Sequence, residues 1–222
     1  MTATPWSRVD DYFANLLGRS DPVLDRALER SRQAGLPNIQ VSPNQGRLLW
    51  LLARSVGARK ILEVGTLGGY STIWLGRALP PVGHLITLEV EPEHARVARA
   101  NVEGAGLGGL VEVRLGDAAE GLRELHAAGA STFDVIFIDA NKDAYETYLR
   151  LALPLAHPGT LLLADNVVRG GTVADAGSRY PQVQGVRRFT EALGRLPNVD
   201  ATVVQTVGAK GYDGFVLGLV TS

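Results

Sequence analysis

The chain has 222 residues, a formal net charge of −1 at pH 7 and no cysteine. Such a small net charge gives no bulk attraction to nucleic acid or to an anionic membrane, and the lack of cysteine excludes disulfides, thiolate nucleophiles and cysteine-based zinc sites. Hydrophobic residues make up 45% of the chain and charged residues 20%, which is typical of a globular protein. The length favours a single α/β domain over residues 1–222.

The N-terminal region, 1–57, is predicted to be helical. Asp21 followed by a proline is typical of a helix start, and Gly35 is typical of a helix end. A second start signal at Ser42 precedes a helix predicted over 44–56. We expect this region to act as a substrate lid or as a dimer element.

From residue 60 onward, short apolar runs alternate with helical patterns, which indicates a mostly parallel sheet with helices on both faces. The predicted strands are 60–64, 84–89, 111–115, 133–138 and 160–164. The predicted helices between them are 70–78, 92–106, 118–128 and 144–156, and residues 157–159, a His-Pro-Gly run, predict a turn.

The pattern changes after the fifth strand. Residues 167–181 are rich in glycine and polar residues and predict a loop, and a helix is predicted over 183–195. The last two strands, 201–206 and 214–220, are so close in sequence that they pair most simply as an antiparallel hairpin. A parallel sheet with such a hairpin is similar to the seven-stranded fold of Rossmann-like class I methyltransferases.

Neither a membrane span nor a signal peptide is expected. No apolar run approaches the roughly 20 residues that cross a bilayer, and Asp10 and Asp11 interrupt the first residues. The lack of cysteine fits a reducing compartment. We therefore expect a cytoplasmic protein with no membrane or nucleic-acid partner.

Three features lie at predicted strand ends, where open α/β sheets bind ligands. The turn 63–71 contains glycines, which let a ligand approach the backbone closely. Glu89 ends the second strand, where a carboxylate can accept hydrogen bonds from both ribose hydroxyls. Ala118 follows the third strand, near the expected place of an adenine ring. These features predict a nucleoside-type ligand, although turn glycines and a surface glutamate also have purely structural uses.

The turn favours S-adenosylmethionine over a dinucleotide. It lacks the G-x-G-x-x-G pattern, because Gly65 is followed by Thr66, Leu67 and Gly68. A diphosphate requires bare backbone amides at the helix start, whereas S-adenosylmethionine has no phosphate and its cationic groups suit an acidic residue before the turn. A nicotinamide-dependent oxidoreductase remains the rival interpretation.

Acidic and amide side chains follow the fourth and fifth predicted strands. These residues are Asp139, Asp165 and Asn166. Adjacent parallel strands lie about 4.8 Å apart, so residues at their ends can converge on one ion. Two carboxylates and an amide oxygen are hard ligands that suit Mg²⁺. Each residue alone could instead cap a following helix, so the hypothesis depends on the joint pattern.

Five motifs occur together between residues 36 and 220. They are I-L-E-V-G-T-L-G-G-Y-S-T, L-E-V-E-P, F-D-V-I-F-I-D-A-N-K, L-L-A-D-N-V and D-G-F-V-L. As a set they resemble the cation-dependent O-methyltransferases of the catechol and caffeoyl-coenzyme A type, including their small bacterial relatives.

The resemblance implies a homodimeric enzyme that moves a methyl group from S-adenosylmethionine to a small catechol-like or phenolic acceptor with the help of Mg²⁺ or another divalent cation. At the matched positions, Lys142 is the implied general base and Asp139 lies near both donor and metal. The implied metal ligands are Asp139, Asp165 and Asn166. The implied donor contacts are Val41, Glu63, Gly65, Thr66, Gly69, Ser71, Glu89, Ala118 and Asp139.

The sequence departs from the family pattern at two positions. Asn141 replaces a common acidic residue, which argues against a further ligand there. Arg169 stands where an aromatic residue often follows the D-N-V motif in the plant-type enzymes, so their substrate is not transferred. The loop 167–181 is expected to help cover the acceptor site, where Arg169, Arg179 and Tyr180 either meet the acceptor or face solvent. The four histidines show no ligand spacing and are expected in turns or on the surface.

The expected chemistry needs a metal and a base. A phenol has a pKa of about 10 and is therefore mostly protonated at neutral pH. A divalent ion would stabilise the oxyanion, and Lys142, once neutral, would take the proton. Two further rivals stay open: a metal-independent methyltransferase of the same fold, and a non-catalytic binding protein that kept the fold.

Overall fold

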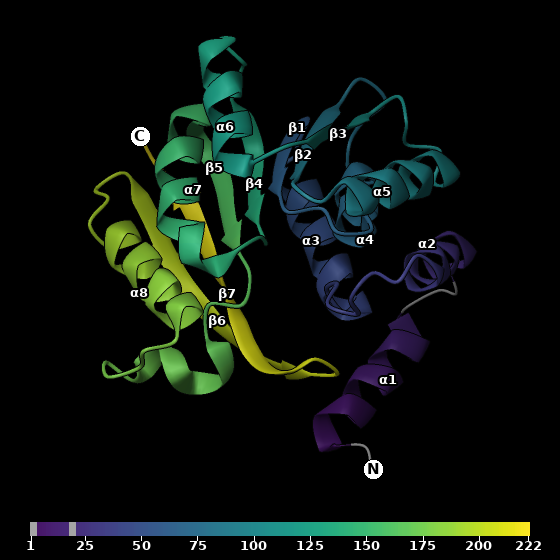
Figure 1. Cartoon of the computed structure of the whole chain (residues 1–222), viewed down its shortest axis with the longest axis horizontal. Coiled ribbons are helices and arrows are strands. Elements are labelled where there is room, and N and C mark those ends of the chain that lie inside the picture. Colours follow the sequence, from purple (N-terminus) through teal and green to yellow (C-terminus); the bar gives the residue numbers. More distant parts are fainter. Residues whose placement is uncertain (1–3, 18–20) are drawn as a thin grey trace.

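The computed structural model describes residues 4–17 and 21–222, so residues 1–3 and 18–20 of the predicted N-terminal region lie outside the described residues. Its centre is a seven-stranded sheet with the order β3-β2-β1-β4-β5-β7-β6 (Figure 1). The strands are β1 (Lys60–Val64), β2 (His84–Glu89), β3 (Val111–Leu115), β4 (Phe133–Ile138), β5 (Ala156–Ala164), β6 (Val199–Gly208) and β7 (Gly211–Val220). The first five strands are parallel, and β7 is antiparallel to both of its neighbours. The predicted fold class is confirmed.

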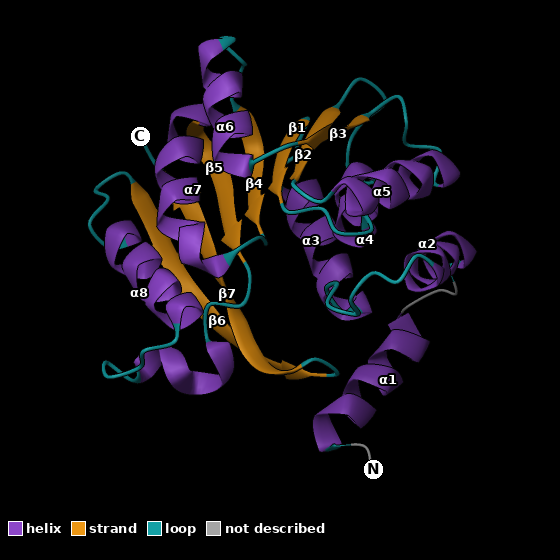
Figure 2. Cartoon of the chain, viewed as in Figure 1, coloured by secondary structure: helices purple, strands orange, loops and turns teal. Residues whose placement is uncertain are grey.

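Helices cover both faces of this sheet (Figure 2). One layer consists of α3 (Pro43–Ser55), α4 (Tyr70–Gly76) and α5 (Pro92–Gly104), with α2 (Pro22–Gln33) packed against α4 and α5. The other layer consists of α6 (Ala118–Ala127), α7 (Tyr145–Ala152) and α8 (Pro181–Leu193).

Strand residues alternate between the two layers. Ile61 packs in the core on the α2–α5 side, whereas Leu62 packs in the core on the α6–α8 side. Successive side chains of a strand point to opposite faces, so each central strand contributes to two hydrophobic cores. Because both faces are covered, only the strand ends remain available for a ligand.

The first helix, α1 (Pro5–Leu17), stands apart from these two layers (Figure 1). It has no buried residue. Asp10 connects it to the rest of the molecule, because its carboxylate accepts hydrogen bonds from Asn44 Nδ2 at 3.0 Å and from the Ala209 amide at 2.7 Å. Among the described helices, none combines the length and the apolar character that crossing a membrane requires.

Two predicted boundaries around β5 are wrong. The predicted helix 144–156 ends early: α7 stops at Ala152 and a 3-10 turn, Leu153–Leu155, follows, because Pro154 cannot donate to a continuing helix. The residues predicted as a turn, 157–159, are a bulge inside β5, since Phe133 pairs with Ala156 and the next pair joins Val135 to Leu161.

The last two strands are longer than predicted. β6 and β7 are joined by the two-residue turn Ala209-Lys210, and β5 pairs with β7 only from Leu161 to Ala164. The hairpin therefore projects beyond the end of β5 (Figure 1). The predicted loop 167–181 contains a 3-10 segment, Arg169–Ala174, and α8 already begins at its last residue.

Candidate active site

A cavity of about 730 Å³ lies at the carboxyl ends of the parallel strands, which is where such sheets bind ligands. Residues that follow β1, β2, β3, β4 and β5 all contribute to its lining. Of the residues predicted to form the site, those lining the cavity are Val41, Gly65, Thr66, Ser71, Glu89, Ala118, Asp139, Lys142 and Asn166. The fold therefore brings most of the predicted donor residues together with part of the predicted metal site.

Glu89 organises the donor end of this cavity. Its buried carboxylate accepts hydrogen bonds from the amides of Thr66 at 3.2 Å, Leu67 at 2.7 Å and Glu91 at 3.0 Å. One side chain thus fixes both the turn after β1 and the start of α5. An ionised carboxylate has about four acceptor positions, so Glu89 can still accept a hydrogen bond from a ligand in the cavity.

His94 is a residue of this region that the sequence did not indicate. Its Nδ1 atom lies 3.6 Å from Glu89 Oε1, and the side chain lines the cavity. It lies in the first turn of α5 with 23% of its side chain exposed. Only the fold brings it to Glu89, because helical spacing alone does not show which residue a histidine faces.

Gly65 joins the donor end to the end of β4. Its φ of 98° lies in the left-handed region, and a Cβ atom there would lie 2.1 Å from the carbonyl oxygen of Asp139. Any other residue would therefore have to push the two strand ends apart. The turn after β1 and the residues after β4 form one continuous surface for this reason.

Two predicted donor residues do not line the cavity. Glu63 is completely buried and accepts hydrogen bonds from Ser71 Oγ at 2.6 Å and Thr72 Oγ1 at 2.5 Å. Burial raises the pKa of this carboxyl to about 7. Gly69 precedes α4 and lies against Ala98 of α5. Both support the turn from behind, and a direct contact of either with a donor stays a prediction.

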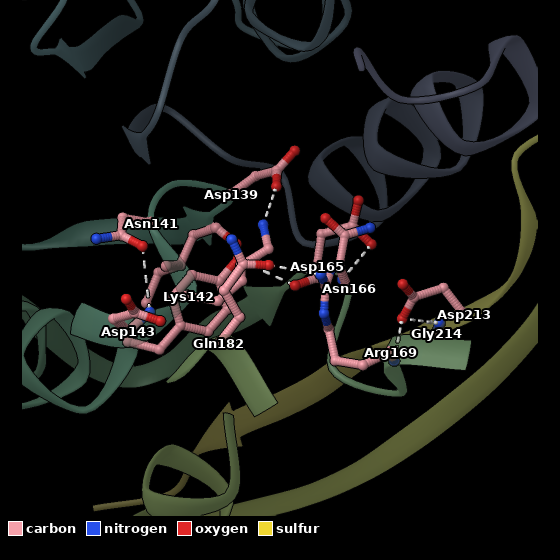
Figure 3. A network of polar contacts seen from close by, with 12 residues as sticks. Asp139, Asn141, Lys142, Asp143, Asp165, Asn166, Arg169, Gln182, Asp213 and Gly214 are labelled. Carbon is pink, nitrogen blue, oxygen red and sulfur yellow. Dashed lines mark hydrogen bonds and ion pairs between the residues drawn. The ribbon is translucent and has the colours of Figure 1, made fainter. Parts of the chain in front are cut away.

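Lys142 lies immediately after β4, in the 3-10 turn Lys142–Ala144. Its Nζ atom donates a hydrogen bond to Asp139 Oδ1 at 2.6 Å and lies 5.0 Å from the centre of the Tyr145 ring, with only 9% of the side chain exposed (Figure 3). Helix α8 supports this turn, because a Cβ on Gly185 would lie 2.2 Å from the carbonyl oxygen of Lys142. The ammonium is thus held at a fixed place beside the cavity.

Asp165 and Asn166 follow β5 next to these residues (Figure 3). The Asp165 amide donates to the carbonyl of Ile138 at 3.0 Å, which continues the pairing of β4 with β5 past their ends. Asp165 is 4% exposed, and its Oδ1 accepts a hydrogen bond from the Asn166 amide at 2.8 Å. Burial raises the pKa of the Asp165 carboxyl, and the nearby Asp139 carboxylate raises it further.

These side chains fit a hard divalent cation. Two carboxylates that destabilise each other's negative charge, beside an amide oxygen, are the oxygen ligands that Mg²⁺ takes in proteins. Within residues 4–17 and 21–222, no three His, Cys, Asp or Glu side chains gather as a ligand group. A metal at this place would therefore need oxygen ligands besides the two carboxylates, and the amide oxygen of Asn166 is of the right kind.

Two residues that support the strand ends were missed. The Tyr145 hydroxyl is buried and lies 3.1 Å from the carbonyl oxygen of Ile138 and 3.0 Å from that of Asp165. Burial raises the pKa of Tyr145 well above its usual value, so the hydroxyl keeps its proton and remains a donor. No sequence signal distinguishes this tyrosine from other apolar-face residues of α7.

Asp213 is the second missed residue. Its Oδ1 accepts hydrogen bonds from the amides of Val168, Arg169 and Gly214 at 2.9 to 3.0 Å. It thereby joins the segment after Asn166 to the projecting hairpin. The closing D-G-F-V-L motif, which begins at this residue, was the signal that could have pointed to it.

The four remaining residues that the sequence singled out lie at or near the surface of the cavity or of the molecule. Arg169 lines the cavity and donates to Gln182 Oε1 at 2.6 Å. Tyr180 is 73% exposed and Arg179 is also exposed. Asn141 is exposed, and its side chain accepts a hydrogen bond from the Asp143 amide at 3.3 Å, which caps the turn that carries Lys142.

Comparisons with known proteins agree with this geometry. The family model described as O-methyltransferase matches residues 18–218. The chain is 52% identical over 212 residues to a catechol O-methyltransferase of Niastella koreensis, covering 96% of each protein.

Solved structures are similar over nearly the whole chain. The O-methyltransferase of Bacillus cereus, in complex with SAH, has a TM-score of 0.96 at 48% identity and covers 97% of this chain and 98% of that one. The O-methyltransferase TomG of Streptomyces achromogenes, involved in tomaymycin synthesis and in complex with SAM, has a TM-score of 0.94 at 49% identity and covers 98% and 97%.

Proposed function

The chain belongs to the O-methyltransferase family, and we propose its function on that basis. In this proposal it transfers a methyl group from S-adenosylmethionine to a hydroxyl oxygen of a small catechol-like or phenolic acceptor, in a site that also holds a divalent cation. The observation that carries the proposal is the single cavity in which the Glu89 turn meets the pair formed by Asp139 and Lys142.

The donor binds at the ends of β1, β2 and β3. Glu89 accepts hydrogen bonds from the ribose hydroxyls, and Ala118 at the start of α6 leaves room for the adenine ring. Val41, Gly65, Thr66 and Ser71 form the wall around the methionine part. The complexes of the two similar proteins with SAM and SAH support this choice of donor.

Asp139, Asp165 and Asn166 hold the cation, because they provide hard oxygen ligands at adjacent strand ends. Bound there, Mg²⁺ supplies positive charge that stabilises an acceptor oxyanion and fixes its position. The similarity to the catechol O-methyltransferase of Niastella koreensis supports an acceptor with neighbouring hydroxyls.

Lys142 acts as the general base in this proposal. In its neutral amine form, Nζ takes the proton from the acceptor hydroxyl and becomes an ammonium. The acceptor oxygen then forms a bond to the methyl carbon while the bond from that carbon to the sulfonium sulfur breaks, which leaves S-adenosylhomocysteine. The chain contributes mainly alignment and charge placement. Asp139 keeps Lys142 beside the acceptor, and Tyr145 limits its other positions.

A chelator experiment tests the function. The protein is freed of metal with EDTA and assayed with S-adenosylmethionine and catechol, with product detected by mass spectrometry. Activity should disappear in EDTA and return with excess Mg²⁺. Full activity in EDTA would instead identify a metal-independent methyltransferase.

A thermal-shift measurement distinguishes the proposal from the oxidoreductase alternative. S-adenosylmethionine should raise the melting temperature of the protein, and NAD should not. Absence of methyl transfer to any diol would favour a non-catalytic binding protein.

The homodimer and the cytoplasmic location stay predictions. Light scattering after size-exclusion chromatography measures the first, and a monomer at micromolar concentration would contradict it.

A further inference from the structure

A second cavity, of about 190 Å³, borders Asp165. It lies between α1, the start of α3 and the β6–β7 hairpin, and shares no lining residue with the donor cavity. The two linings nevertheless meet at consecutive residues, since Val41 and Asn166 line the donor cavity whereas Ser42 and Asp165 line the second. The second cavity therefore adjoins the proposed metal site at Asp165, through a lining separate from that of the donor cavity.

The lining of this cavity combines three kinds of surface. Leu48, Val207 and Phe215 provide apolar walls that suit an aromatic ring. Asp165 provides an oxygen ligand of the proposed metal site. Lys210, in the turn of the projecting hairpin, provides an ammonium group. Because the hairpin extends past the end of β5, Lys210 lies beyond the point where Ala164, the residue before Asp165, pairs with β7.

Lys210 has capacity for a ligand. Its Nζ donates to the carbonyl oxygen of Asn38 at 3.2 Å, which uses one of the three donors of an ammonium. In the described part of the chain, no carboxylate lies within 4.0 Å of it, and it is the only basic residue in the lining of this cavity. Partial burial lowers the pKa of Lys210, since the ammonium has lost part of its hydration.

The carboxylates near Lys210 already have other donors. Asp10 accepts from Asn44 Nδ2 and the Ala209 amide. Asp213 accepts from three backbone amides. In the described part of the chain neither forms an ion pair with Lys210, so an incoming anion does not have to displace one.

We propose that Lys210 is a specificity residue, which binds a carboxylate carried by the acceptor at the end remote from its two hydroxyls. This inference rests on the proposed function and narrows its substrate class to acidic catechols. The ring lies between the apolar walls, the hydroxyls face Asp165, and Nζ donates a charge-assisted hydrogen bond to the carboxylate.

The test compares 3,4-dihydroxycinnamate, which carries a carboxylate, with its methyl ester, in which a methyl group removes the charge. Each is assayed with Mg²⁺ and saturating S-adenosylmethionine. The wild type should prefer the acid. In Lys210→Met, the ratio of kcat/KM for the acid to kcat/KM for the ester should fall by about ten- to a hundredfold. This is the effect expected for loss of one charge-assisted hydrogen bond, and it should arise mainly from a higher KM for the acid. The matched control is Lys60→Met, at the opposite end of β1, where the ratio should not change.

Charge reversal separates recognition from a structural role. In Lys210→Glu the acid should become the poorer acceptor, and 3,4-dihydroxyphenethylamine, which carries an ammonium, should gain relative to the ester. Lys210→Arg should keep the preference for the acid. A structural role, through the contact with Asn38, would change all acceptors in parallel and leave the ratio as in the wild type.

The outcomes distinguish the two proposals. If the wild type methylates both diols and the ratio does not depend on residue 210, the Lys210 proposal is wrong and the proposed function stands. If the wild type methylates neither diol, the proposed function is wrong and the Lys210 proposal falls with it.

Discussion

The acidic side chains at the two ends of the site differ in the groups that donate hydrogen bonds to them. At the ends of β1 and β2, Glu63 accepts hydrogen bonds from two hydroxyls and Glu89 accepts from three amides. At the ends of β4 and β5, Asp139 is paired with Lys142, and the hydrogen bond to Asp165 comes from the amide of the next residue. The donor end is therefore organised by the protein itself, whereas each of the two carboxylates at the metal end accepts fewer hydrogen bonds from the described residues.

This difference indicates what each end requires. A turn whose carboxylates are already satisfied is preorganised and needs little rearrangement when a ligand binds. Two carboxylates that raise the cost of each other's ionisation need a cation close by. We therefore expect changes at the donor end to alter folding and donor affinity, and changes at the metal end to alter turnover.

The largest effect is expected from Lys142→Met. Loss of the general base should lower kcat by about 10²- to 10⁴-fold, while the dissociation constant for S-adenosylmethionine, measured by calorimetry, changes little. Lys60→Met is the matched control, because this lysine lies at the other end of the sheet. A kcat close to that of the wild type would exclude Lys142 as the base and weaken the contrast between the two ends.

Glu89→Ala should act mainly on the donor. The turn after β1 loses its acceptor and the ribose loses its partner, so donor affinity should fall on the order of a hundredfold, from a few hydrogen bonds of about 1 kcal/mol each. Calorimetry with S-adenosylhomocysteine measures the change. Glu93→Ala is the control, since this exposed residue of α5 pairs with Arg96 and does not line the cavity. Unaltered affinity would overturn the ribose assignment.

Glu63→Gln should change how stability depends on pH. The pKa of this carboxyl is about 7 in the folded protein, against 4.5 as its ordinary value, so the folded state holds a proton that the unfolded state releases between these values. The stability from this group is present below about pH 4.5 and is lost as the pH rises to about 7, a loss on the order of 3 kcal/mol.

Urea unfolding at pH 5 and pH 8 measures this effect. The free energy of unfolding of Glu63→Gln, relative to the wild type, should be higher at pH 8 than at pH 5. Glu124→Gln, an exposed change on α6, should show no such difference between the two pH values. If Glu63→Gln behaves like this control, Glu63 is ionised in the folded protein across the range.

The smallest effect is expected from Tyr145→Phe. The change removes the hydroxyl that lies between the carbonyls of Ile138 and Asp165 but keeps the ring beside Lys142. Stability should fall by about 1 kcal/mol, and kcat should fall only a few-fold. Thermal unfolding and steady-state kinetics measure the two quantities. A loss of turnover as large as that of Lys142→Met would show that the tyrosine takes part in the chemistry itself.

The sequence determined the order of the elements, and most of the residues that it predicted for the site line the cavity. The strands 60–64, 84–89, 111–115 and 133–138 were predicted with the bounds that the structure has. Apolar runs, capping residues and turn glycines act over a few neighbouring residues, so they can be interpreted without the fold. Because parallel strands end at one edge of the sheet, these bounds also placed Glu89 and Asp139 at the edge where the first cavity lies.

Only the tertiary structure decided what depends on residues far apart in the chain. The bulge in β5 forms where β4 and β5 pair, and Asp10 reaches the amide of Ala209 across nearly the whole length of the chain. The role of Glu63 as a support for the turn, and the position of Lys210 beside the cavity at Asp165, follow from packing between distant segments. Local patterns cannot encode these contacts, because each requires two parts of the chain to be brought together by the fold.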